Sequence, residues 1–145
     1  MLVLDTNVLS AMMRDPADPA VVQWLDRQAP ESVWTTAVTV FEVRFGLARL
    51  APGRRRAQLE RAFQALLADD LAGRILPLDG AAADRAAQLA ALRAAAGRPV
   101  ELRDTLLAGI VLARGCALAT RNVRHFNDLA EQNPRVTLLD PWAEH

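Results

Sequence analysis

The chain begins with MLVLDTNVLSAMMR (residues 1–14), in which four apolar residues are followed by Asp5 and then by a helix-forming pattern. A short apolar run that leads into such a pattern predicts a buried strand followed by a helix. Asp5 stands where the one gives way to the other. Three roles are open to an aspartate at this point: capping the helix, attacking a phosphoryl group, or binding a metal ion.

Short strands and longer helices continue to alternate along the rest of the chain. Further strands are predicted over 32–36, 74–78, 116–120 and 135–140, and helices over 7–14, 20–29, 37–50, 55–73, 81–97 and 104–115. This alternation is typical of a parallel sheet with crossover helices, so we expect a three-layer α/β/α sandwich with a central, mostly parallel sheet of roughly 4–5 short strands. The length of 145 residues predicts a single domain over 1–145.

Composition excludes several kinds of chemistry. All 17 basic residues are arginine, so a Schiff-base or P-loop lysine is impossible. Two histidines, His125 and the terminal His145, with the single Cys116 are too few for a usual structural zinc site. No stretch approaches the ~20 apolar residues of a membrane span. The single cysteine and the lack of a signal-peptide pattern predict a cytoplasmic protein with no membrane partner.

Four polar residues far apart in the sequence are predicted to meet at one edge of the sheet. Asp5 ends the first strand, Glu42 lies in the second turn of the helix after the second strand, and Asp104 opens the helix before the fourth strand. Asn122 follows that fourth strand directly. In a parallel sheet, the C-termini of the strands and the N-termini of the crossover helices share one edge, where ligands bind.

The three carboxylates have alternative explanations. Asp104 could simply cap its helix, because aspartate is a favoured cap residue. Glu42 has no arginine three or four positions away, so a buried Glu42 needs either an arginine from elsewhere in the fold or a cation. Three carboxylates at one edge raise one another's pKa, and a divalent cation removes that penalty. Oxygen ligands without thiolates favour Mg²⁺ or Mn²⁺, and such ions assist phosphodiester hydrolysis.

Four stretches carry a family resemblance: VLDTNVLS (3–10), FEVRFGL (41–47), RDTLLAGIVLARGCALATRNVRHF (103–126) and LLDPW (138–142). Together they resemble PIN-domain ribonucleases, specifically the VapC toxins of type II toxin–antitoxin systems and, among these, the FitB-like group. The resemblance extends over essentially the whole chain. It implies that Asp5, Glu42 and Asp104 bind Mg²⁺ or Mn²⁺ and catalyse RNA cleavage.

The resemblance also assigns roles to the neighbours of these carboxylates. Thr6 and Asn7 fall on the family's D-[ST]-N signature and would orient Asp5 and metal-bound waters, and Thr120 is expected to support the site from the end of its strand. Many PIN domains carry a fourth acidic residue where this chain has Asn122. We expect Asn122 to take that position as a catalytic residue that holds a water, and Asp128, six residues later, is a weaker substitute.

Basic residues on either side of Asn122 are candidates for substrate binding. Arg121, Arg124 and His125 could contact RNA phosphates, or they could be solvated loop charges. The family further implies a cognate antitoxin whose C-terminal segment occupies the active-site groove. Homodimers, and higher assemblies with antitoxin on operator DNA, are typical of it.

Two other functions compete with a metal-dependent nuclease. The opening strand followed by an aspartate also looks like that of haloacid-dehalogenase phosphatases, but their second aspartate is replaced by Asn7 and their lysine is absent from this chain. Alternatively, the chain could be a non-catalytic PIN-fold subunit of a DNA-binding complex, in which the acidic site is unused.

Overall fold

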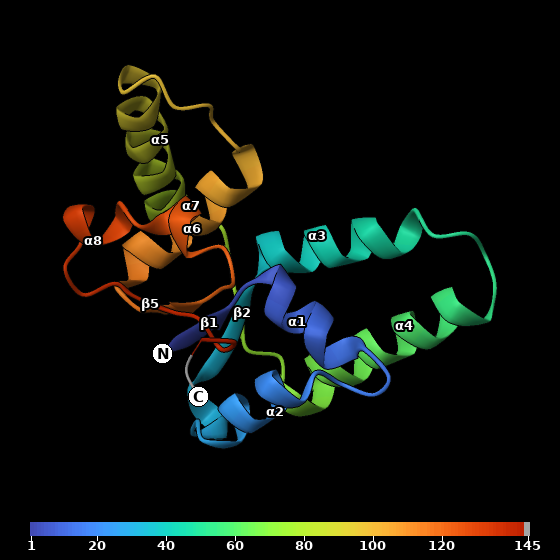
Figure 1. Cartoon of the computed structure of the whole chain (residues 1–145). Coiled ribbons are helices and arrows are strands. Elements are labelled where there is room, and N and C mark those ends of the chain that lie inside the picture. Colours follow the sequence, from blue (N-terminus) through green and yellow to red (C-terminus); the bar gives the residue numbers. More distant parts are fainter. Residues whose placement is uncertain (144–145) are drawn as a thin grey trace.

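The computed structural model describes residues 1–143 and contains a five-stranded sheet (Figure 1). Its strands are β1 (Leu2–Leu4), β2 (Val33–Thr36), β3 (Ile75–Leu76), β4 (Ala117–Ala119) and β5 (Thr137–Leu139). Their order is β3-β2-β1-β4-β5, and every neighbouring pair is parallel. The predicted parallel α/β sheet is confirmed, with β1 at its centre. His145 lies outside the described residues.

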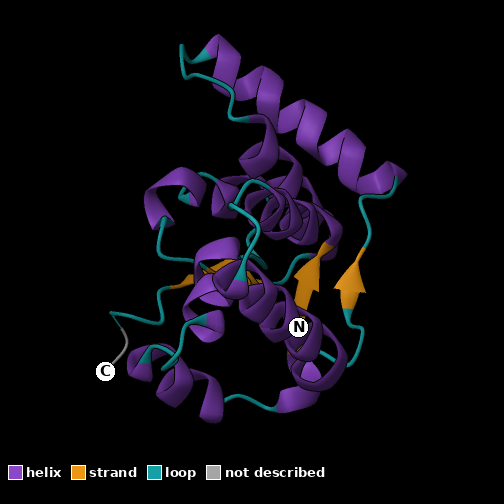
Figure 2. Ribbon diagram, turned by 90° about the vertical axis from the view of Figure 1, so that its right-hand side faces the viewer, coloured by secondary structure: helices purple, strands orange, loops and turns teal. Residues whose placement is uncertain are grey.

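Helices flank the sheet on both sides (Figure 2). The longer ones are α1 (Thr6–Met13), α2 (Pro19–Asp26), α3 (Ala37–Ala48), α4 (Arg54–Ala65), α5 (Gly80–Ala95) and α6 (Leu102–Arg114). Two helices of four residues, α7 (Val123–Phe126) and α8 (Leu129–Gln132), follow β4 and were not predicted, because such short segments show no helical period. Within residues 1–143 no helix is long and apolar enough to cross a membrane.

The predicted helix over 55–73 is wrong in its second half. α4 ends at Ala65, and Leu66–Asp70 forms a wider π-helical turn in which the Leu71 N–H donates to the Leu66 carbonyl at 2.9 Å. Leu66 and Leu71 are both buried in the same core. The wider turn brings both leucines into that core, although they are five residues apart.

Two hydrophobic cores lie on the two faces of the sheet, because successive side chains of a strand point to opposite sides. Leu2 and Leu4 belong to one core, with Trp24 and Phe63. Val3 belongs to the other, which is built mainly from α5 and α6. α6 is largely interior, since seven of its residues are buried. Asp5, the residue after β1, therefore emerges between the two cores.

The contact between α5 and α6 depends on Gly109. A Cβ atom at this position would collide with the Ala82 carbonyl oxygen and lie 2.6 Å from the Ala86 Cβ. We expect Gly109→Ala to lower the free energy of unfolding by about 1–3 kcal/mol, the usual cost of overpacking. Gly46→Ala, in α3 where a Cβ meets no atom within 4 Å, is expected to raise it by up to about 1 kcal/mol. Urea unfolding measures both, and equal stabilities for the two variants would contradict this packing.

Candidate active site

Asp5 is almost fully buried at the end of β1, where it is 5% exposed. Its backbone N–H donates to the Ala119 carbonyl at 3.0 Å, which extends the pairing of β1 with β4. Its Oδ1 accepts the Thr6 N–H at 2.7 Å and so caps α1, while its Oδ2 accepts the Thr120 hydroxyl at 2.7 Å. Asp5 is therefore a helix cap, and the same carboxylate is held at the sheet edge where ligands bind.

Burial raises the pKa of the Asp5 carboxyl above its usual value. The hydrogen bonds from Thr120 and Thr6 act in the opposite direction, and the negative charges of Asp104 and Glu42 raise this pKa further. The two other carboxylates therefore act on the pKa of Asp5 in the direction that the sequence predicted. Such a group is costly to keep ionised unless a cation lies beside it.

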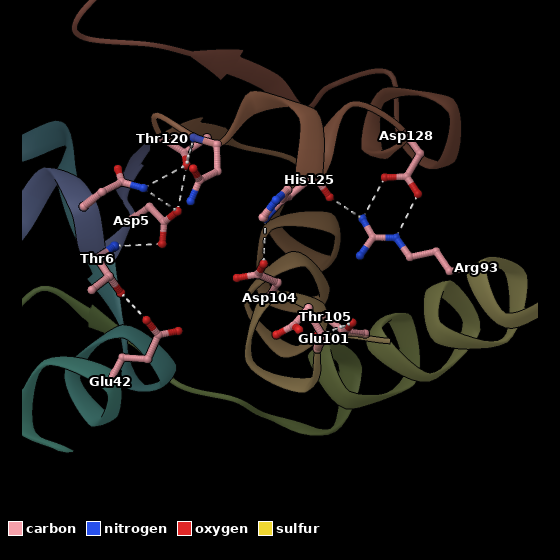
Figure 3. A network of polar contacts seen from close by, with 12 residues as sticks. Asp5, Thr6, Glu42, Arg93, Glu101, Asp104, Thr105, Thr120, His125 and Asp128 are labelled. Atoms are coloured by element: carbon pink, nitrogen blue, oxygen red, sulfur yellow. Dashed lines mark hydrogen bonds and ion pairs between the residues drawn. The ribbon is translucent and has the colours of Figure 1, made fainter. Parts of the chain in front are cut away.

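Glu42 reaches the same edge from the second turn of α3. Its Oε2 accepts a hydrogen bond from the Thr6 hydroxyl at 2.8 Å, as Figure 3 shows. Among residues 1–143 no ion pair includes Glu42, so the structure offers no support for an arginine partner from elsewhere in the fold. Thr6 thus links two of the carboxylates, through its backbone to Asp5 and through its side chain to Glu42.

Asp104 is the third residue of α6, and the prediction that it might cap this helix is wrong. α6 begins at Leu102, two residues before the predicted start, so Glu101 stands at the cap position. The Asp104 Oδ2 lies 3.0 Å from Nδ1 of His125 in α7. This contact is a hydrogen bond from His125 to Asp104 in the imidazole tautomer that has its proton on Nδ1. Asp104 is therefore held by a contact across the fold.

Asn7 and Thr120 connect the start of α1 to the segment after β4. The Asn7 Nδ2 lies 3.5 Å from both the Asp5 Oδ2 and the Thr120 Oγ1, and its Oδ1 accepts the Arg121 N–H at 3.1 Å. Thr120 also accepts the Asn122 N–H at 3.0 Å. The backbone of Asn122 is thereby fixed beside Asp5.

The basic residues after β4 surround a cavity of about 300 Å³. It is lined by Arg121, Asn122, Val123, Arg124, His125 and Asp140. The Arg121 guanidinium lies 4.2 Å from the centre of the Trp142 ring, a cation–π contact. The three basic residues that the sequence singled out therefore line one cavity. His125 connects this cavity to Asp104, because its Nδ1 contacts the Asp104 carboxylate.

Asp128 lies apart from the three carboxylates. Its two oxygens accept hydrogen bonds from Arg93 at 2.8 and 2.9 Å, and Arg98 adds a third at 2.9 Å. The bond from Arg93 holds the pKa of the Asp128 carboxyl below its usual value. In Figure 3 Asp128 lies on the far side of His125 from Asp5. The structure therefore does not support Asp128 as the substitute for Asn122.

Comparison with known proteins identifies the family of this chain. The PIN domain family model matches residues 2–132. The chain belongs to the PIN domain family. It is 34% identical over 142 residues to the VapC ribonuclease Y4jK of Sinorhizobium fredii, covering 98% of each chain. It is also 34% identical over 136 residues to the toxin FitB of Neisseria gonorrhoeae, covering 92% of this chain and 98% of the relative.

Solved structures confirm the PIN fold. The structure of FitAB bound to a DNA fragment, IR36, superposes with a TM-score of 0.83 at 32% identity, covering 98% of this chain and 96% of the other. A DNA-bound VapBC complex from Salmonella typhimurium superposes with a TM-score of 0.75 at 23% identity, covering 97% of each chain. The resemblance to VapC and FitB-like proteins is therefore confirmed over nearly the whole chain.

The donor set of this PIN domain fits a hard divalent cation. Within residues 1–143 no three His, Cys, Asp or Glu side chains are already close enough together to enclose an ion. In Figure 3 the carboxylates of Glu42 and Asp104 nevertheless face the side where Asp5 lies. Their negative charges raise the pKa of the Asp5 carboxyl. All three offer carboxylate oxygens, the ligands that Mg²⁺ and Mn²⁺ prefer.

Sequence reasoning missed two residues around this site. Arg93 is a buried arginine in an alanine-rich helix, and its partner Asp128 is 35 residues away, so no local spacing reveals the pair. Trp142, in the final LLDPW stretch, lies under Arg121, and its indole N–H donates to the Asp18 carboxylate at 3.0 Å. The only sequence signal for Trp142 was its place in a stretch that resembles the family.

Proposed function

We propose that this PIN domain, spanning 1–145 as a single domain, is a Mg²⁺- or Mn²⁺-dependent endoribonuclease toxin of a toxin–antitoxin pair. The observation that carries the proposal is Asp5, a buried carboxylate whose pKa is raised by burial and by two further carboxylates from separate helices. Such an arrangement is costly without a cation, and the relatives include a protein named as a VapC ribonuclease.

Asp5, Glu42 and Asp104 are the proposed metal ligands. When bound, the cation would supply an activated water and neutralise charge on the phosphodiester. Thr6 orients Glu42 through its hydroxyl, and Thr120 orients Asp5 in the same way. These hydrogen bonds fix two of the carboxylates before any ligand arrives, which lowers the cost of assembling the site.

The residues after β4 supply the proposed substrate side. Arg121 and Arg124 line the cavity beside Asn122, and we assign them to contact RNA phosphates. We assign Asn122, in the fourth position of the family's site, to hold a water or a substrate oxygen. Asn7 supports this side, because its amide oxygen accepts the Arg121 N–H. His125 lines the same cavity and contacts Asp104, so it joins the metal side to the substrate side.

The proposed partners are a cognate antitoxin, a second copy of this chain and, with antitoxin bound, operator DNA. Solved relatives include members described as toxin–antitoxin complexes, and FitAB and VapBC complexes bound to DNA. Two groups of exposed apolar side chains are available for such contacts: Phe41 and Phe45 on α3, and Val100 and Leu102 near the start of α6. We place this activity in the cytoplasm, away from membranes.

A non-catalytic role is the second candidate, favoured by the DNA-bound complexes among the relatives. The purified chain separates the two roles. We expect it to cleave single-stranded RNA in Mg²⁺ or Mn²⁺, to lose that activity in EDTA, and to leave p-nitrophenyl phosphate intact. Intact RNA under all metal conditions would favour the non-catalytic subunit. Hydrolysis of the small phosphoester with intact RNA would favour the phosphatase alternative.

A further inference from the structure

Arg93 lies outside the proposed active site and yet is among the most buried charged residues, at 5% exposure. It sits in the last turn of α5. Its guanidinium donates two hydrogen bonds to the Asp128 carboxylate, from Nε at 2.9 Å and from Nη2 at 2.8 Å. Nη2 also donates to the backbone carbonyl of His125 at 2.8 Å. One side chain thus binds the end of α7 and the residue that precedes α8.

The segment that Arg93 contacts depends on tertiary contacts for its position, among them the packing of the fully buried Phe126 and Leu129. α7 and α8 have four residues each, which is too short for a helix to be stable by itself. A guanidinium donates in a rigid, planar fork, so its two bonds to a carboxylate fix direction as well as distance. Arg93 and Asp128 therefore add a directional restraint on the His125 backbone to the packing of Phe126.

The His125 side chain carries this constraint to the site. Its Nδ1 lies 3.0 Å from the Asp104 Oδ2, and Figure 3 shows the continuous row from Arg93 through His125 to Asp104. We propose that the Arg93–Asp128 pair is a clamp that positions His125 and, through it, the Asp104 carboxylate. This inference depends on the proposed function in one respect only, namely that Asp104 is a metal ligand. Arg93 is accordingly a positioning residue.

Arg98 provides a natural control for this clamp. It also donates to Asp128, at 2.9 Å, but its side chain is 41% exposed and the bond goes to the carboxylate alone. If Asp128 served only to anchor α8, loss of Arg93 and loss of Arg98 would have the same kind of effect and differ only in its size. If the clamp acts on His125, only loss of Arg93 or Asp128 should disturb the imidazole.

The direct test is a long-range ¹H–¹⁵N spectrum of the His125 imidazole without metal or RNA, with His145→Ala removing the second histidine signal. In the otherwise wild-type chain and in Arg98→Ala we expect the tautomer with the proton on Nδ1. In Arg93→Met and in the milder Asp128→Asn we expect a mixture of tautomers, as for an unconstrained histidine. An unchanged imidazole signal in both clamp variants would overturn the proposal, whatever the chain does to RNA.

A double-mutant cycle on RNA cleavage supplies the second readout. Arg93→Met should lower kcat/KM by about 10-fold, the usual size of an effect on residues behind a metal ligand. In a His125→Ala background the same change should cost less than about twofold, because the path to Asp104 is already broken. An equal loss in both backgrounds would overturn the clamp. Absence of cleavage by the wild type would overturn the proposed function, and the spectrum would still decide the clamp.

Discussion

Asp5→Asn is expected to reduce the rate of RNA cleavage by at least about 10³-fold, because a bound metal ion supplies several kcal/mol of transition-state stabilisation. Asparagine has nearly the same shape, and its Oδ1 can still accept the Thr6 N–H that caps α1. The loss would therefore come from the missing negative charge. Single-turnover cleavage of an end-labelled RNA at saturating Mg²⁺ measures it. When expressed in a bacterial host, wild type should arrest growth, and neither Asp5→Asn nor Asp104→Asn should.

The matched control is Asp84→Asn, which removes an exposed carboxylate from α5. We expect this variant to cleave RNA and to arrest growth like the wild type. Cleavage by Asp5→Asn within about tenfold of the wild-type rate would contradict a metal site at this edge. Growth arrest that persists unchanged in both Asp5→Asn and Asp104→Asn would assign the toxicity to something other than catalysis.

The second large effect is a reversal in the order of stability. In EDTA, Asp5→Asn should have a higher free energy of unfolding than the wild type, because it removes a buried charge whose pKa is raised by burial and by Asp104 and Glu42. A raised folded-state pKa means that the folded state binds more protons than the unfolded state, so this destabilisation is present at neutral pH. This destabilisation should shrink as the pH falls through the raised pKa of Asp5 toward its ordinary value of 3.8.

Mn²⁺ should invert that order. At a free concentration of 100 times Kd, a ligand that binds only the folded state stabilises it by about 2.7 kcal/mol, which for a domain of this size raises Tm by roughly 5–10 °C. The wild type should show this rise, and Asp5→Asn should not. Thermal unfolding followed by circular dichroism, with Asp84→Asn as the control, measures both. An equal rise in the wild type and in Asp5→Asn would place the ion elsewhere.

The fold and the site edge could be predicted because their signals are local. The apolar residues before Asp5 and the helix after them are contiguous, and parallel crossovers then place Glu42 and Asp104 at the same edge. The family resemblance added specific roles, and the family model has confirmed the family itself. The buried position of Asp5 and the packing of α6 follow from the same apolar pattern.

The parts that escaped prediction depend on contacts between distant residues. Asp104 does not cap α6, because the helix begins earlier and has Glu101 at its cap position. Weak helix propensities do not fix such a boundary to within two residues. The Asp128 carboxylate pairs with an arginine from another helix. The π-helical turn after Ala65 forms because Leu66 and Leu71 both enter one core. These features follow from tertiary packing, which outweighs local preference.

The most direct test of the central claim is calorimetric titration of the metal-free protein with Mn²⁺. With the proposed site of Asp5, Glu42 and Asp104, the wild type and Asp84→Asn should bind the ion with the same affinity. Asp5→Asn and Asp104→Asn should each lose at least about tenfold in affinity, the lower end for changes near a metal. Equal Mn²⁺ affinity in all four proteins, or no binding by the wild type, would contradict a metal site built from these three carboxylates.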